Sequence, residues 1–181
     1  MEKKIQTLAT INTRSFSAAL DEVRLRDGSV SKRIKIDHPE ACAVLPFVSE
    51  REILMVRQYR YALGRETLEI PAGKVDPGEG PEACIKRELL EETGYAAERI
   101  NWIYTYAPAI GYSNELIHIY AGHNLKRVRD QIDEREIATV ERVSMERAKA
   151  LIREGAILDG KTLIGLSIMG FFDRPLRTPT P

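Results

Sequence analysis

Residues 73–95, GKVDPGEGPEACIKRELLEETGY, place Glu79, Glu88, Glu91 and Glu92 around one junction between a loop and a helix. So many like charges in such a short segment need a counter-ion. Carboxylate oxygens are the ligands that hard divalent cations such as Mg²⁺ and Mn²⁺ prefer. The segment therefore predicts a binding site for a divalent metal ion.

Proline and glycine mark the ends of the predicted helix. Residues 76–78, DPG, form a turn signal, and Pro81 fits the first helical position, where a missing N–H costs nothing. Residues 84–93 contain no helix breaker, and Gly94 is a natural left-handed stop. We therefore expect a loop followed by a helix of about three turns.

The helical spacing brings three of the glutamates together. Glu88, Glu91 and Glu92 are neighbours at i, i+3 and i+4, within an arc of about 100°. Like charges at this spacing destabilise an isolated helix, and a solvated acidic face is the alternative interpretation. The setting favours a metal site. The predicted helix opens from a glycine-rich loop, and that loop follows an apolar, strand-like run at residues 67–71.

The segment resembles the Nudix box, whose family pattern is G-x5-E-x7-R-E-U-x-E-E-x-G-U, with U a bulky apolar residue. The positions that match at the required spacing are Gly73, Glu79, Arg87, Glu88, Leu89, Glu91, Glu92 and Gly94. Tyr95 departs from the pattern because it is aromatic rather than aliphatic. The resemblance implies an α/β protein with the Nudix fold, an α/β/α sandwich around a mixed β-sheet with a small N-terminal β extension.

The resemblance to Nudix hydrolases also implies a reaction and the residues that support it. Members of the family cleave a nucleoside diphosphate linked to another group at its pyrophosphate. The metal ligands that the resemblance implies are Glu88 and Glu92, assisted by Glu91 and by the backbone carbonyl of Ala72. Arg87 and Glu79 are expected to orient the carboxylates. A pyrophosphate is itself negative, so it can approach these carboxylates only with intervening cations, and its cleavage mostly requires positioning and charge stabilisation.

The flanking sequence resembles the ADP-ribose pyrophosphatase branch of the family. Residues 56–76, VRQYRYALGRETLEIPAGKVD, look like that branch's entry into the box. The resemblance implies that Arg60 contacts substrate phosphate, with Glu69 and Glu115 as further substrate-binding residues. Residues 107–115, APAIGYSNE, depart from the Ser-Pro-Gly sequence that is commoner in this branch. The alternative for Arg60 and Glu115 is a surface position at the end of a strand.

The catalytic base of this branch lies on a later acidic loop with a Glu-x-Glu pattern. Residues 130–136, DQIDERE, provide that pattern. By resemblance Glu134 is assigned as the base and Glu136 as a supporting or metal-contacting group, and Glu136 and Glu91 are the alternative bases. A solvated charged loop is the structural alternative. A base on a loop could close over the site when metal and substrate arrive.

Composition limits the class of protein. The 181 residues are enough for one domain, and 27 basic against 27 acidic residues argue against a dominant nucleic-acid or membrane surface. No apolar run is long enough to cross a bilayer, and the N-terminus, MEKKIQTLAT, lacks the apolar core of a signal peptide, so we expect a cytoplasmic protein. Cys42 and Cys84 are expected to be buried thiols, and His38, His118 and His123 show no metal-ligand spacing.

The chain is expected to have three segments. They are an N-terminal strand extension at residues 1–37, a Nudix hydrolase domain at 38–173 and a proline-rich tail at 174–181. In the ADP-ribose pyrophosphatase branch such an extension commonly exchanges with a second subunit and helps to build the adenine pocket, which implies a homodimer. The candidates for that pocket are Phe16, Arg24 and Arg33, and Asp27-Gly28 is a hairpin-turn signal.

Apolar patterning predicts the remaining elements of the domain. Strands are expected at residues 41–47, 52–59, 101–106, 116–121 and 137–143. Ser144 is expected to cap a helix over residues 145–154, which Gly155 ends. A last helix is expected over residues 161–172, with its core face formed by Leu163, Leu166 and Met169.

The sequence therefore predicts a Mg²⁺-dependent pyrophosphatase, with Mn²⁺ as the alternative metal, that hydrolyses ADP-ribose or a related ADP-sugar to AMP and a sugar phosphate. Two alternatives stay open. Another nucleoside diphosphate sugar, such as GDP-mannose, would use the same box, because the box handles only the pyrophosphate. A Nudix-fold regulator would bind a nucleotide without cleaving it, although such proteins tend to lose box carboxylates that are intact here.

Overall fold

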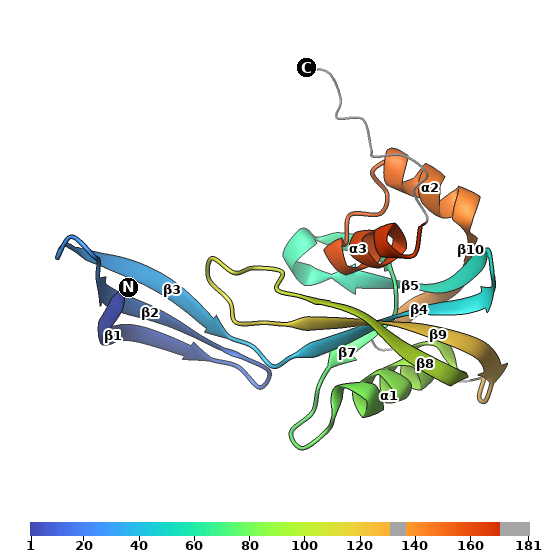
Figure 1. Ribbon diagram of the computed structural model, residues 1–181, viewed down its shortest axis with the longest axis horizontal. Coiled ribbons are helices and arrows are strands. Elements are labelled where there is room, and N and C mark those ends of the chain that lie inside the picture. The colour runs from blue at the N-terminus through green and yellow to red at the C-terminus, as the bar shows by residue number, and fades with distance from the viewer. Residues whose placement is uncertain (131–136, 171–181) are drawn as a thin grey trace.

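The computed structural model describes residues 1–130 and 137–170, and Figure 1 shows two β-sheets joined near residue 37. The smaller sheet is antiparallel, with strands in the order β1-β2-β3. Its strands are β1 (Lys3–Asn12), β2 (Ser17–Arg24) and β3 (Val30–Asp37). The predicted hairpin turn is confirmed, because Gly28 has a φ of 88° between β2 and β3. An N-terminal β extension therefore precedes the main domain.

The larger sheet has seven strands and carries the core. Its order is β10-β5-β4-β9-β8, with β6 beside β5 and β7 beside β4. The strands are β4 (Ala41–Ser49), β5 (Glu52–Arg60), β6 (Arg65–Glu69), β7 (Ala72–Lys74), β8 (Tyr95–Tyr106), β9 (Ile117–Arg127) and β10 (Ile137–Ser144). The β4–β9 pair is parallel and the other pairs are antiparallel, so the sheet is mixed.

Helices cover both faces of this sheet. Helix α1 (Pro81–Thr93) lies on one face, and α2 (Met145–Arg153) and α3 (Gly160–Ile168) lie on the other (Figure 1). Strand β4 is consequently apolar on both sides, as expected for a strand that is covered twice. Val44 packs with α1 residues such as Leu89, whereas Leu45 packs with α3 residues such as Leu166. The α/β/α arrangement predicted from the sequence is confirmed.

The ends of the helices follow the predicted signals closely. Helix α1 has Pro81 in its first turn and ends at Gly94, whose φ is 77° and whose N–H bonds to Leu90 O. Helix α2 starts where Ser144 accepts a hydrogen bond from the backbone N–H of Arg147. The start of α2 and the end of α1 were therefore predicted correctly, from a serine cap and from a glycine in the left-handed conformation.

Two predictions of element length were wrong. The last helix starts at Gly160, where Asp159 accepts a hydrogen bond from Thr162 N, and it ends at Ile168 rather than continuing to residue 172. Gly170 has a φ of 75°, which a continuing helix does not adopt. Strands β8 and β9 are longer than predicted, because their polar ends pair with each other from Tyr95↔Arg127 onward.

Two further expectations concern cysteine and membrane crossing. Cys42 and Cys84 are both free and fully buried, on β4 and α1. None of the helices in residues 1–130 and 137–170 is both long enough and apolar enough to span a bilayer.

Candidate active site

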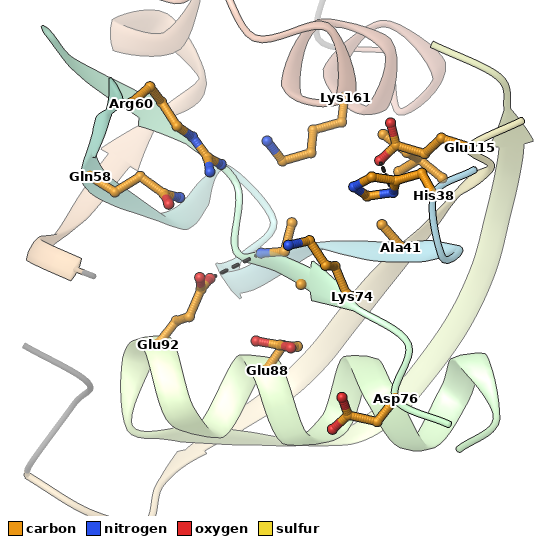
Figure 2. A pocket seen from close by; sticks show the side chains of 13 residues that line it. His38, Ala41, Gln58, Arg60, Lys74, Asp76, Glu88, Glu92, Glu115 and Lys161 are labelled. Carbon is orange, nitrogen blue, oxygen red and sulfur yellow. Dashed lines mark hydrogen bonds and ion pairs between the residues drawn. The ribbon is translucent and has the colours of Figure 1, made fainter. Parts of the chain in front are cut away.

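A cavity of about 420 Å³ opens between the large sheet and the helices on its two faces. Its walls come from β5, β7, α1, α3 and the segments that lead into β4 and β9 (Figure 2). Acidic side chains line it from α1 and at Asp76 and Glu115, and basic side chains line it from β5, β7 and α3.

Glu88 and Glu92 form the acidic side of the cavity, one helical turn apart on α1 (Figure 2). Glu92 is only 6% exposed, and its Oε2 accepts a hydrogen bond of 2.9 Å from the backbone N–H of Ala72. Burial raises the pKa of Glu92 to about 8, and the charge of Glu88 adds to the rise, although the Ala72 N–H opposes it. A charged carboxylate is therefore costly here unless a cation accompanies it.

The structure gives a steric reason for the glycine that opens the box motif. Gly73 lies on β7, directly against the carboxylate of Glu88, and a Cβ built on Gly73 would overlap that carboxylate. The missing side chain therefore makes the space that Glu88 occupies in the cavity wall.

Replacing Gly73 with alanine is expected to displace the Glu88 carboxylate and weaken divalent-metal affinity by about 10- to 100-fold, the usual effect of disturbing the groups that orient a ligand. Titration calorimetry with Mg²⁺ and Mn²⁺ measures this. Gly80→Ala is the matched control, because a Cβ at Gly80 meets nothing within 4 Å. Equal metal affinity in Gly73→Ala and wild type would contradict a metal-binding role for Glu88.

Arg87 holds the acidic groups around the helix in place. Its Nε and Nη2 donate to Glu79 at 3.0 and 2.9 Å, and its Nη1 donates to Glu88 at 2.6 Å and to Glu91 at 3.2 Å. The bond from Arg87 lowers the pKa of Glu79 to about 2, and the bond to Glu79 is the main reason why the pKa of Arg87 is raised. These bonds link Arg87 to Glu79, Glu88 and Glu91, and the orienting role that the resemblance implied for Arg87 and Glu79 stays a prediction.

Glu91 does not line the cavity. Its side chain is 44% exposed and faces Arg87. Among the described residues there is no group of three or more acidic, histidine or cysteine side chains arranged to hold a metal ion. The residues that fit a metal ion here are therefore Glu88 and Glu92, with the neighbouring backbone of Ala72, and the assisting role of Glu91 stays a prediction.

Arg60 and Lys161 form the basic side of the cavity, and both are held by Glu69. Arg60 donates to the two carboxylate oxygens of Glu69 at 2.8 and 2.6 Å, Thr67 donates at 2.5 Å, and Lys161 also pairs with Glu69. Burial alone would raise the pKa of Glu69, but the bonds from Arg60 and Lys161 outweigh it and lower the pKa to about 2. Glu69 is 2% exposed, so it can position these cations but is not itself part of the cavity wall.

Sequence reasoning missed Lys161. It is 7% exposed, and its ammonium group also lies 2.9 Å from Asp159, the residue that caps α3. A buried lysine needs such partners, because an unpaired buried charge is costly. The signal that could have found Lys161 is its charge, the single one in the apolar helix GKTLIGLSI. Lys161 also lies two residues after the charged cap Asp159.

The far end of the cavity is formed by Glu115 and His38 (Figure 2). Nδ1 of His38 lies 3.4 Å from Oε1 of Glu115. Glu115, for which the sequence left a substrate-binding residue and a surface position open, lines the cavity. His38, which the sequence did not single out as a site residue, lies beside it. A second cavity of about 340 Å³ shares both residues and continues toward Phe16.

The predicted base and its supporting residue, Glu134 and Glu136, lie outside the described residues. The roles assigned to them therefore stay predictions. The described chain resumes at Ile137, whose partner in the sheet is Gln58 of β5, a residue of the cavity wall.

Comparison with known proteins adds independent information. The sequence model of the NUDIX domain matches residues 37–163. The chain is 36% identical over 170 residues to the methanol dehydrogenase activator of Bacillus methanolicus, covering 93% of this chain and 92% of that protein. It is 34% identical over 170 residues to the ADP-ribose pyrophosphatase of Bacillus subtilis, with the same coverage.

Two further matches are more distant. The GDP-mannose pyrophosphatase of Salmonella typhimurium is 32% identical over 157 residues, covering 80% of this chain and 81% of that protein. A crystal structure of an ADP compounds hydrolase superposes with a TM-score of 0.77 at 20% identity, covering 92% of both chains. The structural match concerns the fold alone.

Proposed function

The chain is a member of the NUDIX domain family, and we propose that it is a metal-dependent hydrolase that cleaves ADP-ribose, or a related ADP-sugar, to AMP and a sugar phosphate. The observation that carries the proposal is the separation of charge in the cavity. Glu88 and Glu92 lie on one side of it, and Arg60 and Lys161 lie on the other. A pyrophosphate with an accompanying cation fits between two walls of opposite charge.

The family generally uses divalent metals, and we propose Mg²⁺, with Mn²⁺ as the alternative. Glu88, Glu92 and the backbone carbonyl of Ala72 would hold the ion, with Glu91 and Glu136 as further candidates. The raised pKa of Glu92 supports this assignment, because burial makes its charged form costly unless a cation accompanies it. A divalent ion supplies neutralisation of the phosphoryl oxygens and lowers the pKa of water.

The protein's own residues would position the substrate and move the proton. Arg60, fixed in a forked pair with Glu69, presents its guanidinium to a phosphate oxygen. Glu134 would take a proton from the attacking water, and Arg87 would keep Glu88 aimed into the cavity. Because phosphoryl transfer depends mainly on positioning and charge stabilisation, these residues together with the divalent ion would support the reaction.

Room for the nucleoside supports an ADP-sugar. The second cavity shares His38 and Glu115 with the first, and it is lined on its other side by Phe16 and Tyr112. Phe16 and His38 lie with ring centroids 5.8 Å apart, so an aromatic surface is available for a base. The likeness to the ADP-ribose pyrophosphatase of Bacillus subtilis supports the choice of adenine. GDP-mannose is the second candidate, since GDP-mannose pyrophosphatases are also similar to this chain.

We also propose that the protein acts as a cytoplasmic homodimer. The strands of the N-terminal sheet leave several apolar side chains exposed, and apolar surface of this kind is typical of protein interfaces. These side chains are Ile5, Leu8, Ile11, Val30 and Ile34. A partner subunit seated on this sheet would lie near Phe16 and the second cavity.

Product analysis with ADP-ribose is the direct test. AMP and ribose 5-phosphate are expected with Mg²⁺, and EDTA is expected to lower the rate by at least about 100-fold, because the carboxylates then repel the pyrophosphate. Cleavage that EDTA does not affect would contradict the metal assignment. Cleavage of GDP-mannose but not of ADP-ribose would support the second candidate, and nucleotide binding without cleavage of either would support a non-hydrolysing regulator.

A further inference from the structure

One buried polar group of the cavity, the side-chain amide of Gln58, has no role in the proposed reaction. Gln58 lies on β5, two residues before Arg60, so the two side chains leave the strand on the same face. The residue is 5% exposed and belongs to the cavity wall. Its amide nitrogen is the only buried side-chain nitrogen or oxygen that lacks a hydrogen-bond partner within the described part of the chain.

The side chains of β6 that lie beside Gln58 do not supply the missing acceptor. Thr67, its partner on β6, directs its hydroxyl to the backbone oxygen of Gln58 and to Glu69. The Glu69 oxygens are already occupied by Arg60, Thr67 and Lys161. Gln58 lines the cavity together with Arg60 and Glu92 (Figure 2).

An unpaired buried donor is costly, which makes its presence informative. Leaving one unsatisfied costs about 1–3 kcal/mol, and nearly all buried polar groups in proteins have a partner. A methionine of similar size would avoid this cost. Gln58 is therefore better explained by an acceptor that arrives with a ligand than by a contribution to the fold.

We propose that Gln58 is a ligand-binding residue, whose amide nitrogen donates a hydrogen bond to a phosphoryl oxygen of the bound pyrophosphate. The inference rests on the proposed function for the identity of the ligand. The acceptor must be an oxygen, and the adjacent guanidinium of Arg60 favours one that carries negative charge.

The test compares Gln58→Met, which keeps the volume but removes the donor, with Gln58→Glu, which replaces the donor by an acceptor. With saturating Mg²⁺, Gln58→Met is expected to lower kcat/KM for ADP-ribose by about 10- to 100-fold, mainly through KM, as for a lost bond to a charged group. Gln58→Glu is expected to lower it further. The melting temperature of ligand-free Gln58→Met should equal or exceed that of wild type, because no bond of the ligand-free protein is lost.

Arg57→Met is the matched control. Arg57 is the preceding residue of β5 on the opposite face, where it forms a half-exposed pair with Glu141, so its loss should change kcat/KM by less than about threefold. Unchanged kcat/KM in Gln58→Met would overturn the inference. So would a loss of activity accompanied by a lower melting temperature, because that result assigns Gln58 to the fold.

The outcome is separable from the proposed function. If wild type cleaves no nucleoside diphosphate sugar, the proposed function fails, and calorimetric binding of inorganic pyrophosphate with Mg²⁺ then tests Gln58 alone. Weaker binding in Gln58→Met than in wild type would support the inference without the enzyme activity. Equal binding in both proteins, or no binding by wild type, would overturn it.

Discussion

Glu92→Gln is expected to reduce ADP-ribose turnover by about 100- to 1,000-fold, which corresponds to about 3–4 kcal/mol of lost transition-state stabilisation. The substitution removes the more deeply buried of the two cavity carboxylates. It keeps the shape of the side chain, so the bond from Ala72 N–H can persist. The loss should therefore come from weaker metal binding, measured as kcat against Mg²⁺ concentration.

The same variant should be more stable than wild type when no metal is present. The pKa of Glu92 in the folded protein is about 8, above its ordinary value of 4.5. As the pH rises above 4.5, the unfolded chain loses this proton while the folded chain retains it, so wild type loses stability until the pH passes about 8. Glutamine has no proton to lose, and its advantage should reach the order of a few kcal/mol at pH 8.

Thermal unfolding in EDTA at pH 5 and pH 8, with and without Mg²⁺, measures this difference. Glu92→Gln should melt close to wild type at pH 5 and above it at pH 8, and Mg²⁺ should raise the melting temperature of wild type only. The control is Glu82→Gln, an exposed position on the same helix paired with Lys86, which should change neither quantity. Normal turnover of Glu92→Gln at saturating Mg²⁺ would remove Glu92 from the metal site.

The box helix was predictable because its signals are local. Pro81 and Gly94 define its ends, and helical geometry alone brings Glu88 and Glu92 to one face. Which glutamates enter the cavity was not predictable in the same way. Glu91 lies within the same arc as the other two, but Arg87 holds it on the outside of the site.

The basic wall of the cavity was only partly predictable, because its residues meet through tertiary structure. The resemblance singled out Arg60 and Glu69. Lys161 lies 92 positions after Glu69 in the sequence, and only the packing of α3 on the sheet brings these two residues together. Gln58 is one polar residue within a strand, and neither its burial nor its missing partner has a signature in the sequence. Pairing across the sheet likewise lengthened β8 and β9 beyond their apolar cores.

Glu69→Gln is expected to destabilise the metal-free protein by about 3–5 kcal/mol, the usual cost of removing one partner from a buried ion pair. It would leave Arg60 and Lys161 beside a neutral group, with Asp159 as the remaining carboxylate near Lys161. In a protein of this size the melting temperature should fall by roughly 10 °C at pH 7. Glu141→Gln, which breaks the half-exposed pair with Arg57, is the control and should cost about 1 kcal/mol or less.

The pH dependence gives this prediction a second measurement. The pKa of Glu69 is about 2 in the folded protein, below its ordinary value of 4.5. Its contribution to stability is therefore complete above pH 4.5 and declines as the pH falls toward 2. Urea unfolding at pH 7 and pH 3 should show that the gap between wild type and Glu69→Gln narrows in acid. A gap that stays constant would assign the destabilisation to packing rather than to charge.

Adding Lys161→Met to Glu69→Gln separates the stability of this cluster from its part in binding. Glu69→Gln leaves Lys161 without its main partner, and Lys161→Met then removes that unpaired charge. Part of the lost stability should therefore return, as expected for coupled sites. The activity toward ADP-ribose should not return, because Arg60 still lacks the carboxylate that orients it and the cavity has lost a cation. If stability and activity recovered together, the pairs of Glu69 with Arg60 and Lys161 would serve the fold alone. Recovery of stability without activity would show that Glu69 positions these cations for binding in the cavity.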